Sequence, residues 1–197
     1  MNYNARWFFE QFTSRVTEAK YETMYKMHEA EFTPCVTKEI NSIIRDMGLT
    51  SQNEYYRIDA IGWKGRYREL SEEKAKKLNL SRHLWDLEIA VEHENSKSDW
   101  TDELVKLTHI CCPLKVIITY NHCDQRGEVE KNKLAYAAEC MKKVRAFNSL
   151  PQEKYLIIIG NGAPQNSRNE SYNAFDYRGY IYNYDAEGFW EICSVAE

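Results

Sequence analysis

The sequence lacks the segments that would place it in or across a membrane. No apolar run approaches the roughly 18 residues that a membrane-spanning helix needs. The first residues, MNYNARWFFEQF, contain neither the apolar core nor the small-residue cleavage site of a secretory signal peptide. The six cysteines are scattered without a C-x-x-C pair, which is typical of reduced thiols rather than of a disulfide framework. These absences predict a cytoplasmic protein with no membrane partner.

The motifs of several common enzyme classes are also missing. No serine lies in the G-x-S-x-G turn of the α/β-hydrolases. Residues 160–162, Gly-Asn-Gly, follow an apolar run but lack both G-x-G-x-x-G and the Walker lysine. The sequence therefore argues against serine hydrolases, dinucleotide-binding enzymes and P-loop nucleotidases.

Length and composition predict a single domain. The chain has 197 residues, 43% of them hydrophobic, which suffices for a sizeable core. It contains no internal repeat, no low-complexity tract and no linker long enough to divide it. We therefore expect one domain that spans residues 1–197.

The first part of the chain has the apolar spacing of helices. Apolar residues recur every three or four positions over residues 5–30 and predict one helix. A second helix is predicted to be capped by Thr33, to begin at Pro34 and to end at Gly48. The order of elements thus begins with helices.

Strands and helices alternate after that point. Residues 99–108 and 128–147 have helical spacing, and residues 177–192 read as a hairpin that turns at residues 185–188. Strands are predicted at residues 54–63, 85–93, 114–120 and 155–160. The pattern predicts an α/β fold in which helices flank a mixed β-sheet.

Acidic residues alternate along the stretch 85-WDLEIAVEHENSKSDW-100. Asp86, Glu88, Glu92 and Glu94 share one parity, while the other parity is apolar. Carboxylates crowded on one face of a strand are unfavourable unless water or a cation lies among them. The stretch is therefore either a solvated strand face or part of a metal site.

Asp59 lies inside another apolar strand, 54-EYYRIDAIGW-63. An aspartate in such a strand is disfavoured unless it is paired, hydrogen-bonded or bound to metal. One Asp and one Glu from neighbouring strands can hold Mg²⁺, which completes its coordination with water and phosphate. Asp59 with Glu92 is the metal hypothesis. The alternative makes Asp59 the structural partner of Arg57 or Arg66.

The order of elements and these acids together resemble the PD-(D/E)xK nuclease superfamily, which includes many type II restriction endonucleases. The resemblance covers about residues 35–160. It implies a restriction endonuclease-like αβββαβ core, to which an N-terminal helix and a C-terminal hairpin are added. It also implies a hydrolase that depends on Mg²⁺ or Mn²⁺ and cleaves DNA phosphodiester bonds as an endonuclease. By the same resemblance we expect a homodimer, because cutting both strands of a palindrome suits two-fold symmetry.

The resemblance also assigns the site. Asp59 and Glu92 match the two metal-binding acids, and the backbone carbonyl of His93 is a further candidate ligand. Glu39, beside the apolar stripe of the predicted second helix, matches a helical glutamate that some members add. Glu94 occupies the position of the usual lysine. The implied catalytic set is therefore Asp59, Glu92, Glu94 and Glu39.

The missing lysine is the main departure from the family pattern. Some restriction enzymes carry glutamate there, so the resemblance does not exclude activity. A different frame, Glu88-x-Ala90, would lack the third catalytic group. The alternative function is a catalytically inactive protein of the same fold that binds nucleic acid or another protein.

A basic insert lies between the two acidic strands. Residues 64–82 contain seven Lys or Arg against three Glu, whereas the whole chain has a net charge of −4. Such a local cationic patch is typical of surfaces that contact phosphate; a solvated surface helix is the other reading. The candidate DNA-contacting residues are Lys64, Arg66, Arg68, Lys74, Lys76, Lys77 and Arg82.

Overall fold

A single seven-stranded sheet organises the part of the chain that the computed structural model describes, residues 4–16, 29–96, 98–122, 127–149, 153–162 and 176–192. The strands lie in sequence order across the sheet. They are β1 (Thr50–Tyr55), β2 (Ile58–Gly65), β3 (Trp85–His93), β4 (Leu114–His122), β5 (Lys154–Gly162), β6 (Arg178–Asn183) and β7 (Gly188–Glu191). The central strands β3, β4 and β5 are parallel, and the other neighbours are antiparallel.

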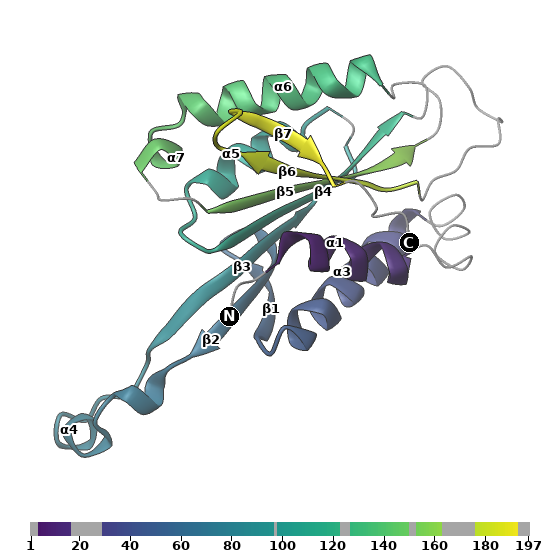
Figure 1. The fold of residues 1–197 in the computed structure, drawn as a ribbon. Helices are drawn as coiled ribbons and strands as arrows, with labels where there is room; N and C mark the ends of the chain where they lie inside the picture. The colour runs from purple at the N-terminus through teal and green to yellow at the C-terminus, as the bar shows by residue number, and fades with distance from the viewer. Residues whose placement is uncertain are drawn as a thin grey trace.

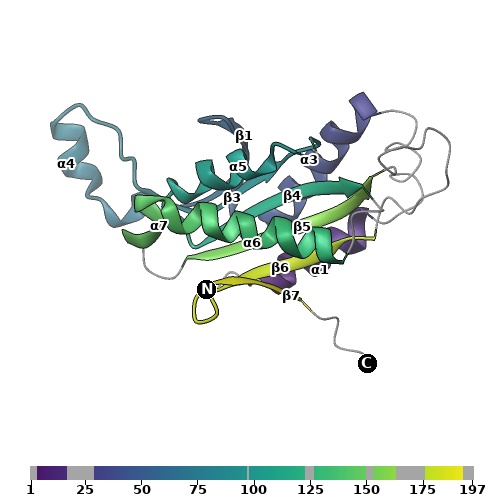
Figure 2. The same ribbon diagram turned by 90° about the horizontal axis from the view of Figure 1, so that it is seen from above.

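Helices cover both faces of this sheet (Figure 1). One face carries α1 (Ala5–Val16) and α3 (Glu29–Asp46). The other carries α5 (Trp100–Thr108), α6 (Glu128–Lys143) and α7 (Arg145–Ser149), and in the view from above α6 lies in front of the sheet and α1 behind it (Figure 2). The predicted α/β class, with a mixed sheet flanked by helices, is confirmed.

Each face of the sheet builds its own hydrophobic core. In β4, Val116 and Ile118 pack toward α1 and α3, whereas Ile117 packs toward α5 and α6. This division follows from the alternation of side chains along a strand. Residues 114–121 are all buried, as expected for a continuous apolar strand covered on both sides.

Helix α3 begins earlier than the sequence predicts. It starts at Glu29, so Pro34 lies inside the helix and Thr33 is not its cap. The ring of Phe32, in the added turn, is fully buried and packs edge-on against the rings of His93 and Tyr120. Burial of that ring outweighs the hydrogen bond that proline cannot donate. The remainder of the helix predicted over residues 5–30 lies largely outside the described residues.

The predicted end of α3 is confirmed. Gly48 adopts a φ of +76°, and its N–H donates to the carbonyl of Arg45 at 2.9 Å. This left-handed conformation is the one that glycine favours after a helix.

The single strand predicted over residues 54–63 is wrong. The chain reverses at Tyr56 and Arg57, whose φ angles are +49° and +64°, and residues 50–65 form the β1–β2 hairpin. Two-residue hairpin turns need positive φ at both central positions, and glycine or asparagine usually supplies it. Neither residue type is present at this turn, so the sequence carried no signal for it.

The helix predicted over residues 128–147 is also divided. Val144 is extended (φ −80°, ψ 124°) and separates α6 from α7. The short α7 places the buried ring of Phe147 against the rings of Tyr155 and Tyr182. Packing of that ring accounts for the break.

Strands β2 and β3 continue beyond the helices into a projecting arm, residues 66–84 (Figure 1). The arm contains the 3₁₀ turn η1 (Tyr67–Glu69) and the short helix α4 (Glu72–Lys77), and no residue of either is buried. The basic insert thus forms an arm outside the body of the protein. Among the described helices, none has the length and apolar character that a membrane crossing requires.

Candidate functional site

The structure brings Asp59 and Glu92 together. Asp59 lies at the start of β2 and Glu92 near the end of β3, and these strands are antiparallel neighbours. The backbone N–H of Asp59 lies 3.4 Å from Oε2 of Glu92. The N–H of His93 donates to Oδ2 of Asp59 at 2.7 Å. Sheet pairing therefore places two acids that are distant in sequence side by side.

A lysine from α5 completes this group of charges. Nζ of Lys106 lies 2.7 Å from Oε1 of Glu92. The same ammonium group donates to the carbonyl of Arg57 at 2.8 Å and pairs with Glu103. Lys106 was not among the candidates from the sequence, because nothing in its local helical spacing indicates a partner on another element. It places a cation directly beside the Glu92 carboxylate.

Burial controls the protonation of the two carboxyl groups. The side chain of Glu92 is only 2% exposed, and this burial raises its pKa to about 8. The Lys106 ammonium lowers that pKa, but the neighbouring charge of Asp59 opposes it. Burial likewise raises the pKa of Asp59. Near neutral pH a positive charge in this place, whether a proton or a metal ion, is favourable.

The donor set fits a hard divalent cation. Mg²⁺ is commonly held by one or two carboxylates, with water and substrate phosphate as the remaining ligands. Asp59 and Glu92 supply two carboxylates, and Oε1 of Glu92 is buried without a hydrogen bond of good geometry. Within the described residues, no group of three or more His, Cys, Asp or Glu is arranged to hold a metal ion. A metal here would therefore rely on water and substrate.

The imidazole of His93 lies on the other side of the sheet. Its Nε2 is 3.0 Å from the hydroxyl of Tyr120, and its ring packs edge-on against Phe32. Complete burial lowers the pKa of His93 to about 4, so the ring is neutral. Only the backbone of His93 is available to the Asp59 carboxylate.

Two other predicted catalytic residues stand apart from this pair. Glu94 follows the end of β3, and its Oε1 accepts the N–H of Ser96 at 2.5 Å. Glu39 lies on α3, which packs on the face of the sheet opposite α5. Neither residue takes part in the contact between Glu92 and Lys106.

The acids of β3 do not share one face, as the alternation of the sequence predicts they should. The pairing of β2 with β3 shifts by one position between Gly62 and Trp63, which leaves Glu88 as an extra residue in a β-bulge. Beyond the bulge the parity is reversed, and Asp86 pairs with Arg66 at 2.8 Å. Arg66 is thus a partner of Asp86 and not of Asp59.

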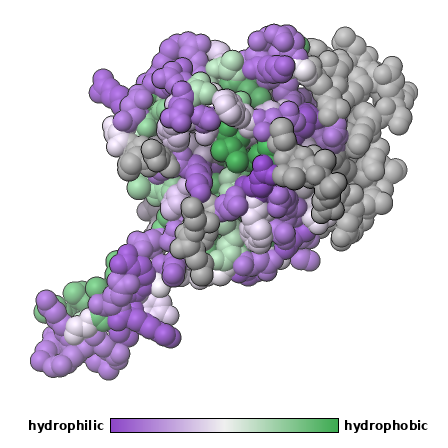
Figure 3. Space-filling view, in the orientation of Figure 1, coloured by the Kyte–Doolittle hydropathy of each residue, from purple (hydrophilic) through white to green (hydrophobic). Residues whose placement is uncertain are grey.

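The cations predicted to contact DNA line the arm and its base. Those that pair with nearby acids are Arg66 with Glu69 and Asp86, Lys76 with Glu72, Lys77 with Glu73, and Arg82 with Glu72. Three of the candidates make no ion pair with any described residue: Lys64, Arg68 and Lys74. The arm is therefore less cationic than its lysine and arginine content indicates. Its surface is largely hydrophilic, with exposed Leu70, Leu78 and Leu80 among the charges (Figure 3).

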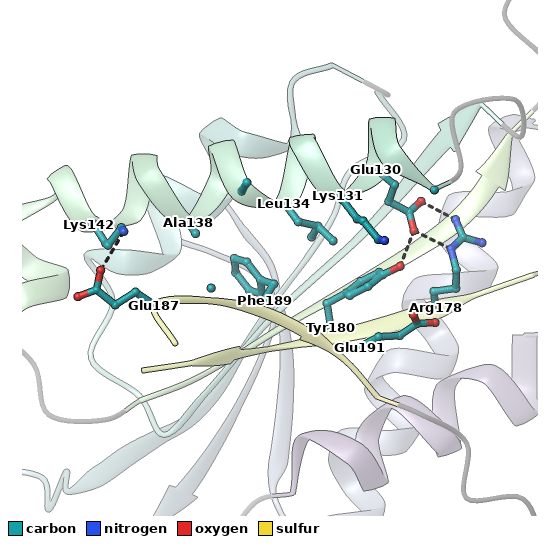
Figure 4. Close-up of a pocket in the computed structure, with 13 residues that line it drawn as sticks. Glu130, Lys131, Leu134, Ala138, Lys142, Arg178, Tyr180, Glu187, Phe189 and Glu191 are labelled. Carbon is teal, nitrogen blue, oxygen red and sulfur yellow. Dashed lines mark hydrogen bonds and ion pairs between the residues drawn. The ribbon is translucent and has the colours of Figure 1, made fainter. Parts of the chain in front are cut away.

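A separate groove of about 530 Å³ lies between α6 and the β6–β7 hairpin (Figure 4). At one end the buried carboxylate of Glu130 accepts two hydrogen bonds from Arg178, both at 2.7 Å, and one from Tyr180 at 2.5 Å. Leu134 and Phe189 form an apolar stretch beside this network. The guanidinium of Arg178 is neutralised by Glu130, so the network joins the hairpin to α6 rather than forming an anion site.

Comparisons with known proteins identify no family for this chain. No family model matches it, and no curated protein or solved structure gives a significant match.

Proposed function

We propose that the protein is a metal-dependent endonuclease that hydrolyses DNA phosphodiester bonds, with a core like that of the type II restriction endonucleases. The observation that carries this proposal is the pair formed by half-buried Asp59 and buried Glu92, held together by the pairing of β2 with β3. The topology supports it. An antiparallel β1–β2–β3 meander, the crossover helix α5 and a parallel β4 follow α3 in the order of an αβββαβ core.

In this proposal the residues have distinct roles. Asp59 and Glu92 hold Mg²⁺ or Mn²⁺, and the metal when bound lowers the pKa of a water molecule and stabilises charge on the phosphate. Lys106 supplies beside Glu92 the positive charge that Glu94 cannot supply. Glu94 accepts the proton of the attacking water after its carboxylate leaves the N–H of Ser96. Lys64, Arg68 and Lys74 position the nucleic acid through its phosphates.

A second candidate function is supported by Lys106 itself. Its ammonium lies between Glu92 and Glu103, so the protein already contains a cation at the acidic site. In a protein of the same fold that has lost catalysis, this lysine would replace the metal. Such a protein would bind nucleic acid, or another protein, without any dependence on Mg²⁺.

Incubation of supercoiled plasmid DNA with the pure protein and Mg²⁺ or Mn²⁺ tests the proposal. We expect nicked and linear products that require the metal. Metal should also raise the melting temperature, since ligand at a hundredfold excess over its dissociation constant stabilises by about 2.7 kcal/mol. Asp59→Asn and Glu92→Gln should abolish both effects. Glu88→Gln, at the bulge, is the matched control and should abolish neither.

Two results would contradict the nuclease proposal. The first is intact plasmid from several DNA sources over a wide range of metal and protein concentrations. The second is a melting temperature that does not change on addition of Mg²⁺ or Mn²⁺, in wild type and variants alike. This result would favour the catalytically inactive protein of the same fold. The homodimer expected for double-strand cleavage is measured by light scattering under the same conditions, and a monomer that cuts both strands would oppose it.

A further inference from the structure

Four aromatic side chains from the β1–β2 hairpin and β3 lie close together. The rings of Tyr55 and Tyr56 have centroids 4.6 Å apart. Tyr55 also lies 5.9 Å from the ring of Trp85, which is in turn 6.1 Å from the ring of Trp63. We refer to Tyr55, Tyr56, Trp63 and Trp85 as the aromatic platform.

The β-bulge at Glu88 brings the platform to the face of the sheet that carries α5. Trp63 packs against the hydrophobic core under α5. Without the extra residue, Trp85 would point to the opposite face from Trp63, because side chains alternate along a strand. The shift in register puts both indoles on one side. A local irregularity that costs strand pairing thus assembles the platform.

Part of the platform packs on the hydrophobic core, and part of it is exposed to solvent. Tyr55 and Trp63 are partly buried against the core, whereas Tyr56 is 79% exposed and Trp85 is 41% exposed. Aromatic rings contribute most to stability when they are buried, so the exposed rings add little to the fold. Exposed aromatic clusters of this kind mark binding sites.

Both cations and acids lie near the platform. Arg57 and Lys64 are exposed and make no ion pair with any described residue. Arg57 follows Tyr56 directly at the hairpin turn, whereas Lys64 follows Trp63 in β2 and so points to the opposite face of the sheet. The acids nearby are Glu54, Asp59, Asp86, Glu88 and Glu103, of which Asp86 pairs with Arg66 and Glu103 with Lys106.

The platform is also next to the acidic site. Tyr55 pairs with Ile58 in the β1–β2 hairpin, one residue before Asp59. The carbonyl of Arg57 accepts a hydrogen bond from Lys106, the lysine that contacts Glu92. A strand of nucleic acid whose phosphate reaches Asp59 therefore has its neighbouring nucleotides within reach of these rings.

We propose that the aromatic platform stacks unpaired nucleobases, so that the strand recognised beside Asp59 and Glu92 is single-stranded or locally unpaired. Aromatic side chains beside cations are the usual device for binding single strands, because every base presents a π-face to stack on. In a duplex those faces are covered by neighbouring base pairs, and only the base edges are accessible. The position of the cleaved bond rests on the proposed nuclease function, but the binding does not.

Fluorescence anisotropy of labelled oligonucleotides tests this inference on the intact protein in EDTA, where no cleavage takes place. The probes are a single-stranded 20-mer, the same sequence as a blunt duplex, and a duplex with a central unpaired loop. We expect the single strand and the looped duplex to bind at least tenfold more tightly than the blunt duplex. Tyr56→Ala and Trp85→Ala should each weaken binding of the single strand by roughly tenfold, as expected for the loss of one stacked base.

Two further variants control for folding and position. Trp85→Phe keeps an aromatic face and should retain most of the affinity. Trp190→Ala removes a ring that is 59% exposed on the distant strand β7 and should leave binding unchanged. Melting temperatures of all variants identify any that fail to fold. Among the folded variants, the decisive comparison is the affinity of Trp85→Phe against that of Trp85→Ala.

The outcomes separate this inference from the proposed function. Tight binding of single strands by a protein that cuts no plasmid would support the platform and contradict the nuclease. Metal-dependent cleavage of duplex DNA that Trp85→Ala and Tyr56→Ala leave unaltered, with equal binding of all three probes, would overturn the platform alone. A protein that binds none of the probes would overturn it too, and would direct attention to a protein partner for the exposed rings.

Discussion

Nζ of Lys106 lies 2.7 Å from Oε1 of Glu92 and so joins α5 to the acidic end of β3. In the nuclease pattern that the sequence resembles, a lysine stands where this chain has Glu94, and the lysine beside Glu92 comes from the following helix instead. The same contact is compatible with a lysine that assists cleavage and with one that replaces a lost metal. Substitution of Lys106 separates these two roles.

Lys106→Met should reduce plasmid cleavage by a factor of about 100 or more, because charge stabilisation by one well-placed group is typically of that size. Binding of Mg²⁺, measured by isothermal titration calorimetry, should persist or strengthen, since a competing cation has been removed. Lys106→Arg keeps the charge and should lose less activity. A Lys106→Met protein with unaltered cleavage would remove Lys106 from the mechanism. If it binds Mg²⁺ while the wild type does not, the inactive alternative is favoured.

The stability of the metal-free protein should depend on pH through Glu92. Its pKa is raised from 4.5 to about 8 on folding, so the folded state holds a proton that the unfolded state has released. Stability is therefore greatest below about pH 4.5 as far as this group is concerned, and falls as the pH rises toward 8. A tenfold change in proton affinity corresponds to about 1.4 kcal/mol, so the loss should be on the order of a few kcal/mol. The raised pKa of Asp59 acts in the same direction.

Urea unfolding in EDTA between pH 5 and pH 9 measures this effect. Glu92→Gln carries no titrating group and should flatten the decline, whereas Glu88→Gln should retain most of it. Saturating Mg²⁺ should weaken the decline in the wild type, because the metal holds Glu92 ionised. An identical pH profile for wild type and Glu92→Gln would show that this carboxyl group is not perturbed by burial.

Among the cations of the arm and its base, those without an ion pair to a described residue should contribute more to DNA binding than the paired ones. Replacing Lys64, Arg68 and Lys74 together by glutamine should weaken binding and lower the slope of log K against log salt by about 0.9 for each phosphate that is no longer neutralised. Replacing Lys76 and Lys77, which pair with Glu72 and Glu73, should have a smaller effect. Binding isotherms over a range of salt concentrations measure both, and an equal effect of the two sets would contradict the expectation.

A buried ion pair lies at the opposite end of the central strands from Asp59 and Glu92. We expect its disruption to lower the free energy of unfolding. Nζ of Lys115 is fully buried, pairs with Glu153 and lies 3.0 Å from the hydroxyl of Tyr155. Lys115→Met alone would leave the Glu153 carboxylate buried without its partner, at a cost of about 3–5 kcal/mol. The double variant Lys115→Met, Glu153→Gln should cost much less, since the amide still accepts the N–H of Cys112. Urea unfolding of the wild type and these two variants measures the difference, and a double variant no more stable than Lys115→Met would contradict this expectation.

The sequence by itself determined the elements whose signals are local. Strands β4 and β5 were predictable because a continuous apolar run must be covered on both faces, and the end of α3 because Gly48 readily adopts positive φ. The pairing of Asp59 with Glu92 was also predictable. A carboxylate within an apolar strand needs a partner, and the nearest strand that carries acids is β3.

Only the tertiary structure decided the features that depend on pairing between elements. The hairpin turn at Tyr56 and Arg57 contains no glycine or asparagine, so the strands on either side impose its positive φ angles. The bulge at Glu88 appears only when β3 is aligned on β2, and it reverses the parity of every residue on the arm side of β3. Lys106 reaches Glu92 because α5 packs over the sheet, a contact that no spacing within either element encodes. Side-chain periodicity fixes which residues share a face of one element, but register and packing fix which faces meet.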